Sequence, residues 1–134
     1  MRHERAHILV VSDDPGFATS LEKTLVRGGY RVQVALLSEF EQSGVDKASQ
    51  NFDLFIVDLA EHVGSGVRFL QRMRNSCPTC TVLLVSALDR DEWEVLLVGR
   101  RGAAILEKPL KRDVLLQKVK ALLASKKVNK LDEV

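Results

Sequence analysis

Acidic, hydroxyl and ammonium side chains follow four short, mostly apolar runs of this chain. The run Leu54–Val57 ends directly at Asp58, a carboxylate of the kind that can act as a nucleophile and become an acyl phosphate. The other pairings are Ile8–Val11 with Asp13 and Asp14, Val82–Val85 with Ser86, and Ala103–Glu107 with Lys108. A hydroxyl and an ammonium group bind and neutralise phosphoryl oxygens, so the residue types together indicate a phosphoryl site.

These side chains meet only if the runs are parallel strands of one sheet, because such strands bring their carboxyl ends to a common edge. Three carboxylates gathered there repel one another unless a positive group lies between them. Magnesium fits this requirement, since it typically takes one or two carboxylates and completes its shell with water and phosphate oxygens. The sequence therefore predicts a Mg²⁺ ion at this edge.

Each residue also has an ordinary structural role. An aspartate just before Pro15 caps a helix, and an aspartate after a strand caps or solvates a loop. A serine in this position stabilises a turn, and a lysine lies on the surface. Taken singly these roles are favoured, but the coincidence at four strand ends favours a shared site.

The pattern of elements supports the parallel arrangement. The buried runs are short, and helix signals follow them: Pro15 to Gly28, Ser38 to Gln50, a start at Ser65, a start near Asp91, and Lys111 to Ser125. The segment 31–34 alternates polar and apolar residues, which is typical of a strand at a sheet edge. Five strand–helix repeats predict an α/β fold, a doubly wound parallel sheet with helices on both faces.

Length and composition limit the number of domains and the classes of partner to expect. The 134 residues are 46% hydrophobic and 28% charged, which fits one globular domain with a charged tail at 126–134 after a domain at 1–125. The net charge of +2 gives no reason to expect nucleic-acid or membrane binding. Neither a signal peptide nor a membrane-spanning run is present, so we expect a cytoplasmic protein.

The tetrad Cys77-Pro78-Thr79-Cys80 has the spacing of a redox pair. Such pairs place their first cysteine at the start of a helix, whereas this tetrad leads into the run that begins at Val82. Two sulfurs also cannot complete a tetrahedral zinc site. We therefore expect two loop cysteines without redox or metal chemistry.

The chain resembles the receiver domain of two-component response regulators. The resemblance rests on the acidic pair after the first strand, Asp58 at the end of the third, Ser86-Ala87 and Lys108-Pro109, and it extends over about 8–123. It implies a flavodoxin-like sheet of five strands in the order 2-1-3-4-5, and this order comes from the family and not from the apolar runs. The alternating strand at 31–34 falls at an edge in that order.

The resemblance also implies a role for each residue. Asp58 would accept a phosphoryl group from the phosphohistidine of a sensor histidine kinase or phosphotransfer protein, and the chain would not be an enzyme beyond slow self-dephosphorylation. The implied magnesium ligands are Asp14, Asp58 and the carbonyl of Ala60, with Asp13 binding through water. Ser86 would bind the phosphoryl group, Lys108 would pair with it, and the Lys108–Pro109 peptide bond would be cis.

Besides Ser86, which stands where the family has threonine, and a Gly-Ala pair displaced by one residue at Gly102-Ala103, the sequence departs from the family in the loop after Asp58 and in the last strand. Glu61 and His62 stand where the family usually has Met-Pro, and Ile105 stands where it usually has a tyrosine or phenylalanine that rotates inward on phosphorylation. With Trp93 in an apolar fourth helix, Ile105 suggests a docking or homodimer surface built from the fourth helix, last strand and last helix, although burial of Trp93 in the core is an equal alternative.

Three functions remain at this point. The first is a phosphoacceptor switch with a downstream protein partner, and the second is an interaction module of the same fold that no longer relies on phosphorylation. A metal-dependent phosphohydrolase ranks third, because it would need Asp-x-Asp on one strand and the adjacent pair Asp13-Asp14 lacks that spacing.

Overall fold

The computed structural model describes residues 5–36, 51–58, 71–73, 75, 77, 79–87 and 103–132, with only the backbone described at 103 and 126–132. The expected helices at 38–50 and from Asp91 lie outside these residues, as does the start of the helix expected from Ser65. The same is true of Ala60, Glu61, His62 and Trp93.

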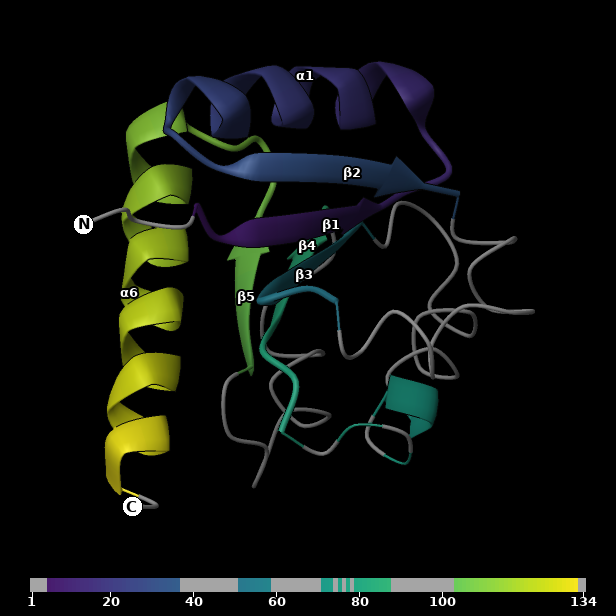
Figure 1. The fold of residues 1–134 in the computed structure, drawn as a ribbon. Helices are drawn as coiled ribbons and strands as arrows, with labels where there is room; N and C mark the ends of the chain where they lie inside the picture. The colour runs from purple at the N-terminus through teal and green to yellow at the C-terminus, as the bar shows by residue number, and fades with distance from the viewer. Residues whose placement is uncertain are drawn as a thin grey trace.

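Five parallel strands form one sheet in the order β2-β1-β3-β4-β5 (Figure 1). Their bounds are β1 (His7–Val11), β2 (Arg31–Ala35), β3 (Leu54–Asp58), β4 (Val82–Ser86) and β5 (Ala103–Glu107). Every residue of β3 and β4 is buried, as expected for strands covered on both faces. The predicted doubly wound fold and its strand order are confirmed.

Helices lie on both faces of this sheet. α1 (Pro15–Arg27) and α6 (Arg112–Asp132) pack on one face, where Leu21, Leu25, Leu115 and Val119 join a core with alternate residues of the strands. The helical residues 71–73 and 75 lie on the side away from α1 (Figure 1). The second core includes Leu9, Val11, Phe55, Val57, Met73, Cys80, Val82, Leu84 and Ile105. Successive side chains of one strand thus reach opposite cores.

β2 is the exception in burial. It lies at the edge of the sheet beside β1, and none of its residues is buried. Val34 is 42% exposed on this strand. The prediction from alternating polarity is therefore confirmed, since an edge strand has only one neighbour to cover it.

The two main helices end differently. α1 stops at Gly28, and Gly29 follows with φ 99°, a backbone conformation that glycine adopts without steric cost. α6 continues to Asp132. The prediction that this helix ends near Ser125 and is followed by a frayed tail is therefore wrong for the residues up to Asp132. No glycine or proline follows Ser125 to stop the helix. No helix in the described part of the chain has an apolar stretch long enough to cross a bilayer.

The two cysteines form a disulfide, Cys77–Cys80, just before β4. The sequence analysis expected two loop cysteines and did not predict this bond. The expectation about the local structure is right, because Cys77 follows helical residues instead of starting a helix. The backbone N–H of Cys77 donates to the carbonyl of Met73 at 2.8 Å.

Candidate functional site

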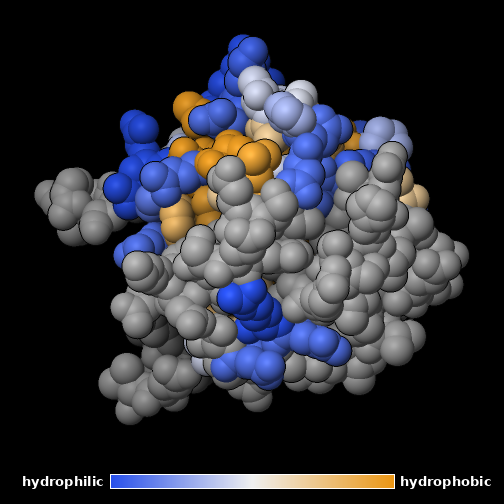
Figure 2. Space-filling model, turned by 90° about the vertical axis from the view of Figure 1, so that its right-hand side faces the viewer, coloured by the Kyte–Doolittle hydropathy of each residue, from blue (hydrophilic) through white to orange (hydrophobic). Residues whose placement is uncertain are grey.

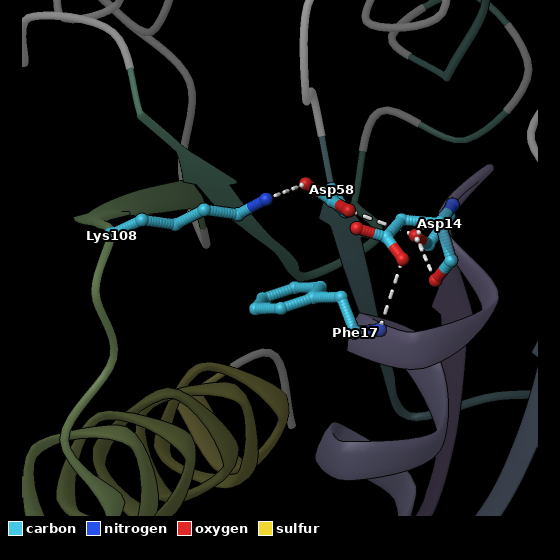
Figure 3. Close-up of polar contacts among 5 residues, drawn as sticks. Asp14, Phe17, Asp58 and Lys108 are labelled. Carbon is cyan, nitrogen blue, oxygen red and sulfur yellow. Dashed lines mark hydrogen bonds and ion pairs between the residues drawn. The ribbon is translucent and has the colours of Figure 1, made fainter.

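Asp58 is a buried carboxylate at the carboxyl end of β3. Its side chain is 0% exposed, and each oxygen has a partner on another element (Figure 3). Lys108 Nζ lies 2.8 Å from Oδ1, and the hydroxyl of Ser12 donates to Oδ2 at 2.8 Å. Apart from this ammonium, no hydrogen-bond donor contacts Oδ1 among the described residues. A charge so far from water requires such compensation, because burying it unpaired costs several kcal/mol.

The sheet register explains the contact with Ser12, a residue that sequence reasoning missed. Val11 of β1 pairs with Val57 of β3, so the residues after them, Ser12 and Asp58, lie side by side. Each is the first polar residue after four apolar ones, and this shared position was the available signal. Ser12 is 1% exposed, and its Oγ also accepts a hydrogen bond from the N–H of Asp14 at 3.0 Å.

Asp14 serves as the N-cap of α1. Its Oδ1 accepts a hydrogen bond from the N–H of Phe17 at 3.1 Å, and Pro15 occupies the first position of the helix. This is the ordinary structural role that the sequence left open for the acidic pair. One of the two oxygens of Asp14 thus caps the helix, and its expected role as a magnesium ligand stays a prediction.

The expected crowd of three carboxylates is not found. Within the described ranges, no group of three or more His, Cys, Asp or Glu side chains is placed to hold a metal ion. In the arrangement seen here, the positive group beside Asp58 is Lys108, and one oxygen of Asp14 caps α1. The set of magnesium ligands that the resemblance implies stays a prediction. The donor set still fits Mg²⁺, which needs only one or two carboxylates when water and phosphate supply the rest. Asp58 and the exposed Asp13 are candidates for such binding.

Ser86 ends β4 at the same edge of the sheet. Asp58 pairs with Val85 in the register, which places Ser86 one position beyond Asp58 on the neighbouring strand. The residue is fully buried, and its carbonyl accepts a hydrogen bond from the N–H of Lys108 at 2.9 Å. The end of β4 is thus linked through the backbone to the residue that pairs with Asp58.

Lys108 reaches Asp58 from the connection between β5 and α6. Its Nζ lies 4.1 Å from the centre of the Phe17 ring of α1, so a cation–π contact adds to the ion pair. The following peptide bond, Lys108–Pro109, is cis, as the resemblance implied. Lys108 and Phe17 also line a groove of about 460 Å³ between α1 and the start of α6. On another side of the molecule, Figure 2 shows a patch of hydrophobic residues in the upper part of the view, with hydrophilic residues around it.

Ile105 lies in β5 and is buried, with 7% of its surface exposed. It belongs to the core on the side of Met73 and Cys80. Ile105 therefore adds nothing to an exposed docking surface, and this part of the hypothesis is wrong. The other residue of that hypothesis, Trp93, lies outside the described residues, so the docking surface itself stays a prediction.

The structure thus brings Asp58, Ser86 and Lys108 to one edge, as predicted, and adds Ser12 to them. A carboxylate held between a hydroxyl and an ammonium group can accept an electrophilic phosphoryl group, and the ammonium group can then offset the added negative charge. This chemistry depends on positions at strand ends, which the parallel sheet fixes.

Comparisons with known proteins agree with this geometry. Residues 8–120 match the response regulator receiver domain family. Response regulator ArlR of Staphylococcus haemolyticus is 29% identical over 119 residues, covering 87% of this chain and 52% of ArlR. Transcriptional regulatory protein ZraR of Escherichia coli is 31% identical over 113 residues, covering 84% of this chain and 25% of ZraR. The chain thus spans about half of one relative and a quarter of the other.

A solved structure shows the same fold. The CheY-like response regulator receiver domain protein from Methanospirillum hungatei superposes with a TM-score of 0.80 at 24% identity, covering 94% of this chain and 99% of that one. Since the family match covers most of the sequence, the conclusion is direct: this chain belongs to the response regulator receiver domain family of two-component signal transduction.

Proposed function

We propose that this chain accepts a phosphoryl group on Asp58 from the phosphohistidine of a sensor histidine kinase or phosphotransfer protein, and that phosphorylation switches a partner-binding surface. Receiver domains are typically regulatory and not enzymatic, and they interact with such kinases and with downstream effectors. The observation that carries the proposal is the buried carboxylate of Asp58 with Lys108 Nζ at 2.8 Å. A buried ion pair adds little stability compared with an apolar pair, so its position at the strand ends favours a functional role.

The reaction needs few groups. A bond forms between a carboxylate oxygen of Asp58 and phosphorus while the phosphorus–nitrogen bond of the phosphohistidine breaks. The ammonium of Lys108 offsets the charge of the phosphoryl oxygens, and the hydroxyl of Ser86 donates to one of them. Such transfers depend mainly on positioning and charge neutralisation.

Magnesium is part of the proposal. Receiver domains generally bind Mg²⁺ at their acidic pocket, and here Asp58, Asp13 and the carbonyl of Ala60 would hold it, with Asp14 contributing through the oxygen that does not cap α1. The ion would supply positive charge to the phosphoryl oxygens. Since Oδ1 of Asp14 already accepts from Phe17, we expect Asp13 to matter more for Mg²⁺ affinity.

The contacts of Lys108 suggest how the site would signal. This residue contacts Asp58 through its ammonium group, the ring of Phe17 in α1, and the carbonyl of Ser86 through its backbone. A phosphoryl group on Asp58 changes the charge that the ammonium faces, so the connection between β5 and α6 is a natural element to respond.

The test is phosphorylation by acetyl phosphate with Mg²⁺, followed by intact mass spectrometry. We expect one added phosphoryl group on the natural chain and none on Asp58→Asn. Asp113→Asn, an exposed aspartate in the first turn of α6, is the matched control and should react like the natural chain. Equal phosphorylation of the natural chain and Asp58→Asn would contradict the proposal.

A second experiment separates the switch from an interaction module that does not rely on phosphorylation. Beryllofluoride with Mg²⁺ mimics a phosphoryl group on a carboxylate, and we expect it to shift the NMR signals of Ser86 and Lys108. Unchanged spectra at saturating beryllofluoride would favour the module.

A further inference from the structure

The Cys77–Cys80 disulfide lies at the amino end of β4, while Ser86 lies at the carboxyl end of the same strand. The N–H of Cys77 donates to the carbonyl of Met73 at 2.8 Å, which joins the cysteine to the preceding helical turn. The N–H of Cys80 donates to the carbonyl of Cys77 at 3.1 Å, which closes a tight turn. The disulfide therefore spans the connection between a helix and a central strand of the sheet.

The two sulfurs differ in their surroundings. Cys80 is 4% exposed and belongs to the core with Met73 and Val82, whereas Cys77 is only partly buried at the edge of that core. Thr79 Oγ1 lies 3.9 Å from the sulfur of Cys77. A reagent from solution therefore reaches the sulfur of Cys77 more readily than that of Cys80.

We propose that Cys77–Cys80 is a redox site that exchanges with small thiols and disulfides of the glutathione class, with Cys77 as the sulfur that is attacked. This function is independent of phosphorylation and uses none of the residues around Asp58. It follows from the pairing of one accessible sulfur with one buried sulfur in the same short turn.

The exchange balances in two steps. A glutathione thiolate attacks the sulfur of Cys77, a mixed disulfide forms there, and Cys80 leaves as a thiolate that takes up a proton. A second glutathione thiolate attacks the glutathione sulfur of the mixed disulfide, and Cys77 leaves and is protonated. Two glutathione thiols have then become glutathione disulfide while the protein disulfide has become two thiols; oxidation by glutathione disulfide runs the same steps backwards.

The turn favours re-formation of the disulfide after reduction, because the shape of the turn does not depend on the sulfur–sulfur bond alone. The two backbone hydrogen bonds and the packing of Cys80 remain available when the bond is cleaved. They keep the two thiols close, and closing so short a loop costs little chain entropy. Metal binding is a weaker explanation of the pair, since no third ligand joins it in the part of the chain that the structure describes.

The experiment uses the full chain in glutathione buffers of stepped ratio, with rapid alkylation and mass spectrometry. We expect no alkylation in oxidising buffer, two alkyl groups in reducing buffer, and full return on reoxidation. Matched single variants then separate the sulfurs: Cys80→Ser retains the accessible sulfur and Cys77→Ser the buried one. With glutathione disulfide, Cys80→Ser should form the mixed disulfide faster, by on the order of tenfold.

Two results would overturn the proposal. The first is a natural chain whose two thiols stay alkylatable in glutathione disulfide, a measurement that needs no variant. The second is an equal rate for the two single variants while circular dichroism shows both folded; in denaturant their rates should converge. Phosphorylation of Asp58 is measured separately, so failure of the redox site leaves the phosphoacceptor proposal intact.

Discussion

The two ends of the sheet's central strands are held by different kinds of contact. At the carboxyl end, a buried charge on Asp58 of β3 is balanced by Lys108 and by the hydroxyl of Ser12, over distances of 2.8 Å. At the amino end, just before β4, a covalent bond joins Cys77 to Cys80, and Cys80 packs in an apolar core. Ionic contacts respond to a new charge or ion, whereas a disulfide and apolar packing respond to neither.

This difference assigns separate tasks to the two ends. The ion pair at the carboxyl end contributes little net stability, since two charges had to leave water to form it, but removing one partner leaves the other uncompensated. The amino end adds stability by constraining the unfolded chain. Changes at the two ends should therefore have different signatures, and the following variants test that contrast.

The largest effect is expected for Lys108→Met. The change leaves the buried charge of Asp58 without its ammonium partner, while an apolar side chain of similar length remains. Because the lysine side chain is 20% exposed, we expect a loss near the lower end of the range for broken buried pairs, about 3 kcal/mol in the free energy of unfolding. Urea unfolding measures it.

The control is the double variant Lys108→Met with Asp58→Asn. Removing the charge as well as its partner should restore most of the lost stability, because no buried charge remains unpaired. If the double variant is as unstable as Lys108→Met, the ionic account of the carboxyl end is wrong.

The disulfide tests the other end. Reduction of the natural chain should lower the free energy of unfolding by about 2 kcal/mol, the value that the loop-closure relation gives for so short a loop. The double variant Cys77→Ser with Cys80→Ala should show no response to dithiothreitol. An equal stability of the natural chain with and without reductant would mean that the amino end is held by packing alone.

Local sequence signals predicted much of this architecture. The apolar runs identified β1, β3, β4 and β5, because strands buried on both faces are apolar throughout. Pro15 identified the start of α1, and the alternating residues of 31–34 identified the edge strand. The order of the strands came from family resemblance, since apolar runs alone do not specify their neighbours.

The details of the site were less predictable. Whether Asp13 or Asp14 turns toward Asp58 depends on how the chain leaves β1, and the N–H of Phe17 competes for the carboxylate of Asp14. Ser12 gained its role from the register of two strands, which is a long-range property. The disulfide depends on the turn between Cys77 and Cys80, a three-dimensional feature that residue spacing alone does not establish.

Ser12→Ala tests the contacts of Asp58 and should lower the free energy of unfolding by less than the changes above. The change removes the hydrogen bond to Asp58 Oδ2. We expect a loss of about 1.5 kcal/mol in the free energy of unfolding, the lower end of the range for hydrogen bonds to charged groups. Ser20→Ala, at an exposed position of α1, is the matched control and should change stability by less than about 0.5 kcal/mol. Equal free energies of unfolding for the two variants would mean that the hydrogen bond of Ser12 to Asp58 does not stabilise the site.

Changes at Asp14 should have the smallest effect on stability, and they separate helix capping from Mg²⁺ binding by the same carboxylate. Asp14→Ala removes the cap of α1 and should lower stability by about 1 kcal/mol, while Asp14→Asn keeps a capping oxygen and should cost almost nothing. Both variants remove the charge, so the Mg²⁺ concentration for half-maximal phosphorylation reports metal binding apart from capping. We expect Asp13→Asn to raise this concentration more than Asp14→Asn does. The reverse order would mean that Asp14 binds the ion through its free oxygen while its other oxygen holds the helix.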